Sequence, residues 1–373
     1  MGFVNLFVVA LMPVLKTLLI TGVGLLLAID RIGLLGPDAR HILNNIVFFV
    51  FTPALMVSNL SETITFQGLI TLWFMPVNIL LTFIIGSTLA WILVKITRTP
   101  RHLHGLVIGC CSAGNLGNLL LIIVPAVCDE TNSPFGDSST CSTNGEVYAS
   151  LSMAVGAIYI WSYVYTIMRI FANKSIGEPS KTFSETCTVS LLPSSDCPSF
   201  DDHSDQVELP LNLSGGEVKA VGLIIGIVSP IRKLMIGDSA PLRVITSSAS
   251  LLGEATIPSM TLIVGANLLN GLRRSEVSLL LTVGVMAVRY IALPLLGILV
   301  VKAAYMWGMV GSNSLYQFIL MLQYALPPAM SIGTITQLFG ASECECSVIM
   351  LWSYVAALFS ITLWSTFYMW IVS

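Results

Sequence analysis

Charged side chains are scarce in this chain. Asp, Glu, Lys and Arg make up 10% of its 373 residues, whereas hydrophobic residues make up 55%, and the mean hydropathy is +0.86. A soluble globular domain carries about 25% charged residues, so the composition excludes that class. We expect a polytopic membrane protein whose apolar segments cross the bilayer repeatedly.

The signatures of common enzyme sites are also missing. The sequence contains no phosphate-binding loop, no HExxH zinc motif and no nucleophile elbow with Ser, His and Asp. The four histidines fall in loops or at the edges of apolar segments, where solvated side chains are the simpler interpretation. Cys344 and Cys346 form a close pair, but no neighbouring His or Cys completes a zinc site. We therefore expect no enzymatic activity, no catalytic residues, no cofactor and no metal.

A basic N-terminal region and a disulfide framework are absent as well. No Lys or Arg precedes Lys16, and a cleavable signal peptide needs a basic start, so the first apolar segment is expected to remain as a helix. The eight cysteines are spread over apolar segments and loops. Cys128 and Cys141 share one short loop and are expected to pair only if that loop faces an oxidising lumen.

The chain does contain ten apolar segments that are long enough to cross a bilayer. They cover approximately residues 5–29, 39–60, 67–96, 102–127, 146–172, 216–236, 241–269, 276–303, 313–339 and 345–372. The one long polar segment, 173–215, is rich in Ser, Asp, Glu and Pro and is expected to be a disordered linker. It separates a first five-helix repeat, 1–172, from a second five-helix repeat, 216–373.

Prolines recur in the same order in the two halves. Pro53 in the second segment corresponds to Pro258 in the seventh, and Pro13 in the first corresponds to Pro230 in the sixth. A repeat with an odd number of spans enters the membrane upside down the second time, which is the inverted-repeat plan of many secondary carriers. The expected fold is therefore all-α, with ten transmembrane helices in a 5+5 inverted repeat.

Two of the apolar segments are interrupted at matching places. The fourth contains two glycines and two asparagines within residues 114–118, and the ninth contains Pro327 and Pro328 side by side. Gly and Asn disfavour a continuous helix, and proline removes a backbone donor. Such breaks survive inside a membrane only where they are buried in protein or line a cavity, and a matched pair indicates a transporter binding site.

The fourth segment supplies the polar groups of this expected site. Asn115 and Asn118 offer carboxamides, and Gly114 lies beside them. The half-helix that restarts after the break directs its partially positive N-terminus at the site, which suits a carboxylate ligand. In the alternative interpretation, the asparagines only join neighbouring helices through hydrogen bonds.

Three ionisable residues fall near the centres of apolar segments: Lys16, Glu254 and Arg289. Charges at that depth are costly and are usually paired or functional. One hypothesis is a structural bridge between Lys16 and Glu254. Another is that Glu254 takes up a proton or cation and couples it to transport. Arg289 is either a point of attraction for an anion or a buried pairing partner.

Basic residues favour one orientation. With the N-terminus lumenal, eleven Lys and Arg residues fall on the cytosolic side and four on the other, while Lys16 and Arg289 are mid-span. Cytosolic loops carry the excess of Lys and Arg, so both termini are expected in the lumen and the linker in the cytosol. The seven tryptophans lie mostly toward segment ends and are assigned to the interfacial aromatic belt, with none assigned to a ligand.

Several stretches resemble a known family. Residues 111–119 (CSAGNLGNL), 236–242 (IGDSAPL) and 252–258 (LGEATIP) closely resemble the plant PIN-LIKES auxin carriers, and Leu326-Pro327-Pro328 resembles the helix break of the wider auxin efflux carrier family. The resemblance covers nearly the whole chain except the linker.

The resemblance implies a ten-helix fold similar to bile-acid symporters, in which the broken fourth and ninth helices cross at the substrate site. It also implies residence in the endoplasmic reticulum membrane and transport of indole-3-acetate between cytosol and lumen, which controls intracellular auxin distribution and nuclear auxin signalling. The motif residues carry over to Gly114, Asn115 and Asn118, and the break to Pro327 and Pro328.

The expected mechanism is alternating access. The auxin carboxylate would bind near Asn115 and Asn118, and the indole ring would lie against scaffold side chains around Pro53 and Pro258. The expected partners are this small molecule and the lipid bilayer, without nucleic acid, and a homodimer is left open. Three alternatives remain: a carrier of another organic anion, a sodium- or proton-coupled carrier, and a membrane receptor that binds ligand without transporting it.

Overall fold

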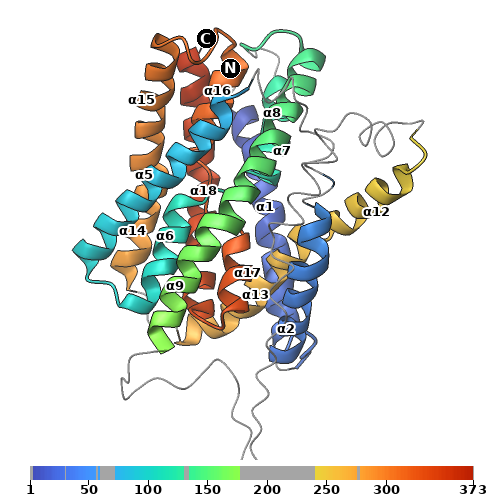
Figure 1. Ribbon diagram of the computed structural model, residues 1–373, viewed down its shortest axis with the longest axis vertical. Coiled ribbons are helices and arrows are strands. Elements are labelled where there is room, and N and C mark those ends of the chain that lie inside the picture. The colour runs from blue at the N-terminus through green and yellow to red at the C-terminus, as the bar shows by residue number, and fades with distance from the viewer. Residues whose placement is uncertain are drawn as a thin grey trace, which may run out of the picture.

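The computed structural model describes residues 3–29, 31–55, 58, 72–129, 134–176, 240–274 and 278–372. Throughout these ranges the regular structure is helical, apart from one isolated bridge between Gly114 and Pro328. The helices form a bundle in which α1 begins and α18 ends at the same end (Figure 1).

Several of the helices are short, because breaks divide longer apolar segments. The helices before residue 177 are α1 (Phe3–Ala28), α2 (Pro37–Ile46), α5 (Phe74–Thr97), α6 (His104–Ser112), α7 (Asn118–Cys128), α8 (Ser138–Tyr159) and α9 (Tyr165–Ile176). Those after residue 239 are α12 (Arg243–Glu254), α13 (Thr256–Arg274), α14 (Leu279–Ala287), α15 (Leu293–Met306), α16 (Ser314–Leu322), α17 (Ser331–Leu338) and α18 (Glu343–Val372). Wider π-helical turns continue three of them: η1 (Val47–Phe51), η3 (Ile160–Val164) and η4 (Val288–Ala292), and a 3₁₀ turn, η2 (Arg101–Leu103), precedes α6.

Five stretches within the described ranges are long and apolar enough to cross a membrane: Phe74–Thr97, Ser138–Ala172, Arg243–Leu268, Leu279–Met306 and Glu343–Val372. Each overlaps a segment that the hydropathy predicts. The first, fourth and ninth predicted segments are also largely helical, as α1, as α6 with α7, and as α16 with α17. The sixth segment, 216–236, lies outside the described residues, as does the linker beyond residue 176.

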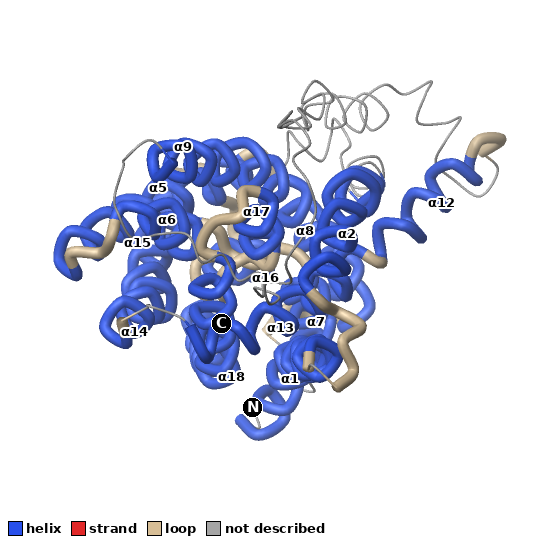
Figure 2. The backbone as a smooth tube through the Cα atoms, turned by 90° about the horizontal axis from the view of Figure 1, so that it is seen from below, coloured by secondary structure: helices blue, strands red, loops and turns tan. Residues whose placement is uncertain are grey.

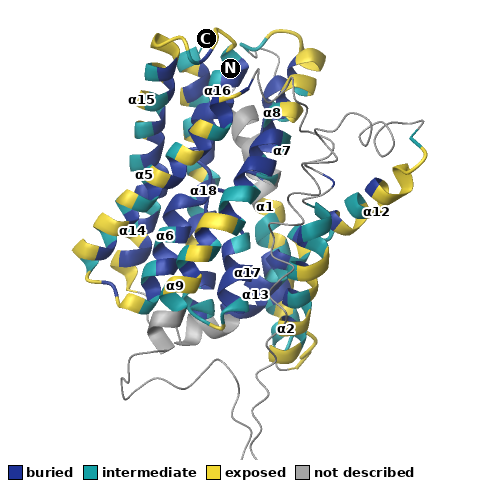
Figure 3. Ribbon diagram, in the orientation of Figure 1, coloured by how far each residue is buried: buried dark blue, intermediate teal, exposed yellow. Residues whose placement is uncertain are grey.

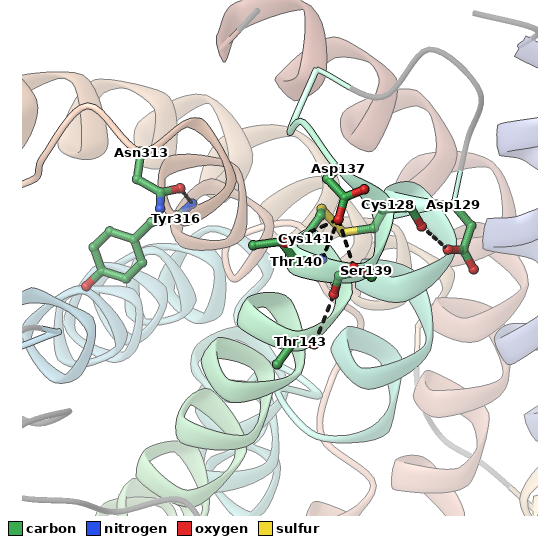
Figure 4. The surroundings of a disulfide bond; sticks show 10 residues. Cys128, Asp129, Asp137, Ser139, Thr140, Cys141, Thr143, Asn313 and Tyr316 are labelled. Carbon is green, nitrogen blue, oxygen red and sulfur yellow. Dashed lines mark hydrogen bonds between the residues drawn. A yellow bond between two sulfur atoms is a disulfide. The ribbon is translucent and has the colours of Figure 1, made fainter.

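The start of α8 differs from the sequence prediction. The helix begins at Ser138, whereas the apolar segment was predicted from residue 146. Asp137 is the N-cap, since its carboxylate accepts a hydrogen bond from the backbone N–H of Thr140 (Figure 4). Hydrogen bonds from Ser139 and Thr140 also hold the pKa of Asp137 below its ordinary value. A capped polar turn thus extends the helix beyond its apolar part.

A disulfide bond joins Cys128, at the end of α7, to Cys141 in the first turn of α8 (Figure 4). It closes a loop with a sequence separation of 13 residues at the end of the bundle that also holds both ends of the chain (Figure 1). Cys344, at the start of α18, is disulfide-bonded as well, whereas Cys110, Cys111 and Cys346 are free and buried.

The bundle has a buried interior and an apolar exterior. Non-helical stretches run through its middle when it is seen from below (Figure 2). Buried residues line the inner faces, while α12 projects from the bundle and is largely exposed (Figure 3). The outer faces of α14 and α15 carry exposed apolar side chains such as Leu280 and Leu299. Such a surface is suited to lipid, because water would not favour it.

Helices α1 and α13 approach each other closely, and glycines permit it. A Cβ added at Gly24 of α1 would overlap the backbone carbonyl of Leu262, and one at Gly265 of α13 would overlap the carbonyl of Thr21. A Cβ at Gly22, by contrast, would meet nothing within 4 Å. Small residues let the backbones of membrane helices pack closely in this way.

We expect Gly24→Ala to destabilise the protein, because the added methyl group must push α1 and α13 apart. Overpacking of this kind costs about 1–3 kcal/mol. Gly22→Ala is the matched control on the same helix and should leave stability unchanged or slightly higher. Thermal unfolding of both variants in detergent checks this, and equal unfolding temperatures would contradict the close approach.

Candidate functional site

Two broken helices meet in the interior of the bundle. Helix α6 ends at Ser112 and α7 begins at Asn118, while α16 ends at Leu322 and α17 begins at Ser331. Two C-terminal ends and two N-terminal ends of helices therefore converge. The negative and positive ends of four helix dipoles lie close together, where the bilayer core is expected to be.

Backbone hydrogen bonds join the two breaks. The N–H of Asn115 donates to the carbonyl of Pro327 at 2.8 Å. In return, the N–H of Ala329 donates to the carbonyl of Ala113 at 3.0 Å. This antiparallel bridge satisfies backbone groups that the interrupted helices leave without intrahelical partners. The structure therefore brings the glycine–asparagine break and the proline pair into direct contact.

Arg289 fastens the crossing from behind. Its side chain is fully buried, with Nη1 3.1 Å from the carbonyl of Cys111 and Nη2 3.1 Å from that of Pro327. It lies on the π-helical turn η4, where Val288, Arg289 and Tyr290 are all buried. One guanidinium thus bonds to a carbonyl at the C-terminal end of α6 and to one in the second break, and it favours the negative ends of the dipoles there.

Tyr354 of α18 ties the side chain of Asn115 to the same place. Asn115 Nδ2 donates to the Tyr354 hydroxyl at 2.8 Å, and that hydroxyl donates to the Pro328 carbonyl at 3.1 Å. The asparagine is half-buried and its amide retains a second N–H. Tyr354 therefore holds the Asn115 side chain in one orientation, and the second N–H of its amide remains available to a ligand.

A second buried network supports the end of α16. Asn78 Nδ2 donates to Gln323 Oε1 at 2.8 Å, and Gln323 Nε2 donates to Ser152 Oγ at 2.8 Å. The Tyr324 hydroxyl lies 3.2 Å from Asn78 Oδ1. All four side chains are buried and bonded to one another, so this part of the crossing is rigid.

A cavity adjoins the crossing. It offers about 90 Å³ to the centres of water-sized molecules, enough for several waters since one needs about 10–15 Å³. Its lining comes from the two breaks, from α8 with η3, from the segment after η1, and from the start of α13. The lining residues are Thr52, Leu55, Gly114, Asn115, Leu116, Gly117, Met153, Ala154, Gly156, Ala157, Ile160, Trp161, Thr256, Ile257, Met260, Ala329, Met330 and Ser331.

The expected site residues differ in how close the structure places them to the cavity. Gly114 and Asn115 line the cavity, and Pro327 and Pro328 form the crossing behind it. Asn118 is the first residue of α7, and the direction of its side chain lies outside what the structure describes. The start of α7 nevertheless lies at the cavity, because Gly117 lines it.

The two scaffold prolines do not line the cavity themselves. Their neighbours do: Thr52 beside Pro53, and Ile257 beside Pro258. Pro258 is exposed. Each proline thus lies one position away from a residue that lines the cavity.

The three mid-span charges separate into two kinds. Lys16 and Glu254 are both exposed, and the described part of the chain contains no ion pair between them. The expected structural bridge is therefore not formed. Arg289, in contrast, is buried at the crossing, and no carboxylate among the described residues pairs with it. Its partners are backbone carbonyls.

The sequence does not identify Trp161 and Tyr354 as residues of the site. Trp161 lines the cavity, although a tryptophan in a membrane-spanning segment is more often part of the aromatic belt. The π-helical turn η3, in which it lies, redirects the side chains there. Tyr354 lies in a long, predominantly apolar segment, and nothing in the local pattern distinguishes its role.

We expect Arg289→Met to lower the unfolding temperature, because it removes the donor to the buried Cys111 carbonyl and one of the two donors to the Pro327 carbonyl. Each unsatisfied group costs about 1–3 kcal/mol. Lys302→Met is the matched control, since Lys302 is exposed on the adjoining helix α15. Differential scanning fluorimetry in detergent would measure both, and an Arg289→Met protein as stable as the parent would show that the guanidinium does not fasten the crossing.

The sequence has relatives of the same kind along nearly its full length. The family described as membrane transport protein matches residues 9–191 and 220–365. The chain is 49% identical to Protein PIN-LIKES 1 of Arabidopsis thaliana, over 100% of this chain and 81% of that protein. It is 48% identical to Protein PIN-LIKES 3 of the same plant, over 99% of both chains. An uncharacterised transporter of Schizosaccharomyces pombe is 20% identical over 86% of each chain.

These matches agree with what the bundle contains: apolar helices long enough to span a membrane, and two broken helices that cross beside a cavity. The chain belongs to the membrane transport protein family, among its PIN-LIKES members, and is a transporter rather than an enzyme.

Proposed function

We propose that this transporter carries auxin, as the indole-3-acetate anion, across the endoplasmic reticulum membrane by alternating access. The proposal rests on the resemblance to PIN-LIKES auxin carriers and on one observation above all. A buried guanidinium without a carboxylate partner among the described residues stands directly behind a cavity at the crossing. The positive charge attracts an anion to the cavity and repels a coupling cation from the same place.

The binding mode follows from the lining. The carboxylate would accept a hydrogen bond from the spare N–H of Asn115, close to the N-terminal ends of α7 and α17. The indole ring would lie among Met153, Trp161 and Met260, where thioether and aromatic groups contact it favourably. Asn118 belongs to the proposed site as the first residue of α7.

The moving parts are proposed from the placement of this site. Helices α1, α2, α12 and α13 would form the scaffold, and the helices that carry the crossing would shift against it. The cavity lies between these two groups, because Thr52 and Ile257 come from one and Asn115 and Ser331 from the other. A ligand shifts such an equilibrium only as far as it prefers one state over the other. Ten helices in an inverted repeat, divided by the 173–215 linker, remain the proposed plan.

We expect Asn115→Leu to weaken binding of indole-3-acetate roughly five- to hundredfold, because the carboxylate loses a donor in a site of low dielectric. Transport currents on a solid-supported membrane, with purified protein in liposomes, would measure this with and without sodium. Asn144→Leu removes an exposed carboxamide from α8 and serves as the control.

Each result of this experiment selects one function. A sodium-independent current that weakens in Asn115→Leu supports the anion carrier. A strictly sodium-dependent current would favour the coupled carrier instead. Stabilisation by the ligand without transport of radiolabelled auxin would favour a receptor, and transport without a current would favour proton coupling, with the exposed Glu254 as the first residue to test.

The orientation gives a second prediction. The proposed lumenal end holds both ends of the chain and the Cys128–Cys141 bond (Figure 1). In endoplasmic reticulum membranes we expect the bond to be formed, since the lumen is oxidising. Without reducing agent, a thiol-reactive polyethylene glycol should leave both cysteines unmodified in denatured protein, whereas Cys128→Ser should expose one new thiol at Cys141. Modification of both in the unreduced parent would contradict this orientation.

A further inference from the structure

A second group of buried polar side chains lies away from the cavity, where α2 faces α17. Arg40 and Asn44 lie one turn apart on α2, and Thr334 and Gln337 lie one turn apart on α17. Their exposed fractions are 6%, 0%, 2% and 6% in that order. Residues at these spacings occupy one face of each helix, so two polar faces meet inside an otherwise apolar bundle.

These faces connect four helices. Asn44 Nδ2 donates to the Thr334 carbonyl at 3.3 Å, which joins α2 to α17. Arg40 Nη1 lies 2.5 Å from Oδ1 of Asn267 on α13, and its charge interacts with Glu343 at the start of α18. The contacts therefore run between the proposed scaffold, α2 and α13, and the helices of the crossing, α17 and α18.

This cluster is incompletely bonded, unlike the network around Asn78. Four buried atoms lack a hydrogen-bond partner among the described residues: Arg40 Nε, Asn44 Oδ1, Thr334 Oγ1 and Gln337 Oε1. Most buried polar groups in proteins are bonded to protein or to water. Ten such atoms occur among the described residues, and four of them lie together on these two facing helices, which makes this the place to look for a bound molecule.

The chemistry of these atoms identifies the ligand as water. Arg40 Nε is a donor, the two carboxamide oxygens are acceptors, and the threonine hydroxyl is both. A cation would be repelled by the guanidinium of Arg40, and an anion by the carboxamide oxygens of Asn44 and Gln337. A water molecule accepts from Arg40 Nε or the threonine hydroxyl and donates to the two carboxamide oxygens, and buried waters commonly make about three such bonds.

The position of the cluster gives it a role. Ser331 lines the cavity, and Thr334 follows it one turn later on α17. The cavity and the cluster thus lie along the same boundary between the two groups of helices. We propose that Arg40, Asn44, Thr334 and Gln337 form a water-binding seam that closes one end of the cavity and parts during transport. The inference rests on the proposed alternating access, because it assigns the surface at which the two groups separate.

The physical reason is the cost of separation. If the facing surfaces of α2 and α17 were apolar, separating them would expose apolar surface to water, which costs free energy. Polar surfaces that already bind water lose little when they separate, because further water molecules replace the contacts between the helices. We therefore expect Asn44→Leu with Thr334→Val to dry the seam and hold it closed. The two substitutions remove Asn44 Oδ1 and Thr334 Oγ1, which have no protein partner, and they cost one long hydrogen bond, from Asn44 Nδ2 to the Thr334 backbone carbonyl. The unfolding temperature should therefore change little.

The test uses access to the cavity and needs no substrate. Met153→Cys is introduced into a protein with Cys110, Cys111, Cys187, Cys197, Cys344 and Cys346 changed to Ala, so that it is the one reactive thiol beside the Cys128–Cys141 disulfide. It is labelled in liposomes by a membrane-impermeant maleimide from each side separately. In the Asn44→Leu/Thr334→Val variant, labelling from the seam end should slow about tenfold or more, which corresponds to about 1.4 kcal/mol in favour of the closed state. The control is Asn45→Leu/Thr336→Val, with the same residue types on the same helices but outside the cluster.

A second variant tests the seam in case the Asn44→Leu/Thr334→Val protein does not fold. With Asn44→Cys/Thr334→Cys, cadmium should bridge the seam and stop labelling from that end, and a chelator should restore it. The Ser314→Cys/Val372→Cys pair joins α16 to α18 within one group of helices and should show no cadmium effect on labelling.

The outcomes separate this inference from the proposed substrate. Seam-dependent labelling in a protein that does not transport indole-3-acetate would keep the seam and remove auxin. Auxin transport with labelling at the parent rate in a folded seam variant would overturn the seam and keep the carrier.

Discussion

The crossing of two broken helices depends on the guanidinium of Arg289. Four helix ends meet in a place where water is scarce, and each break exposes backbone carbonyls that a continuous helix would have satisfied. Arg289 donates to the carbonyl of Cys111 at the C-terminal end of α6 and to that of Pro327 in the second break. Two backbone hydrogen bonds between the breaks complete the contact. Without this fastening the glycine and proline segments would be unsatisfied backbone in the core of a membrane protein.

The same arrangement gives the cavity its electrostatic character. The guanidinium is buried with only neutral partners among the described residues, so its positive charge is not cancelled locally. The N-terminal ends of α7 and α17 add partial positive charge at the lining itself. A cavity with apolar walls and a positive back is suited to a small amphipathic anion. It also explains why no arginine needs to face the ligand directly.

Hydrogen-bond satisfaction distinguishes two kinds of polar contact in the bundle. The network of Asn78, Ser152, Gln323 and Tyr324 is bonded among its own members and lies within the helices that carry the crossing. The cluster on α2 and α17 lies between helix groups and leaves several atoms without a protein partner. Fully bonded networks rigidify a body, whereas partly bonded ones tolerate the entry of water. A transporter needs both kinds of contact. The fully bonded network keeps the site rigid, and the partly bonded contact lets the helices that carry the site move as a unit against the others.

The local sequence was sufficient for the breaks but insufficient for their surroundings. Gly114 and the Pro327-Pro328 pair can be recognised from the sequence, because glycine and proline alter backbone geometry whatever surrounds them. The roles of Trp161, Met153 and Tyr354 cannot be recognised in this way. The sequence pattern does not say whether an aromatic or thioether side chain in an apolar segment faces lipid or the protein interior. The pairing of Lys16 with Glu254 could not be judged from the sequence for a similar reason: both residues are exposed, and depth along two helices says nothing about which faces they turn toward each other.

Composition and periodic hydropathy determined that the chain is a multi-spanning membrane protein, and the residue types at the breaks determined where its helices are interrupted. The tertiary structure decided that the two breaks touch, that Arg289 bonds to backbone rather than to an acid, and that the cavity opens beside Asn115. The difference is physical. Backbone conformation and transfer into lipid are set by each residue and its neighbours, whereas the partner of a buried polar group depends on helix packing between residues as far apart as 111 and 289.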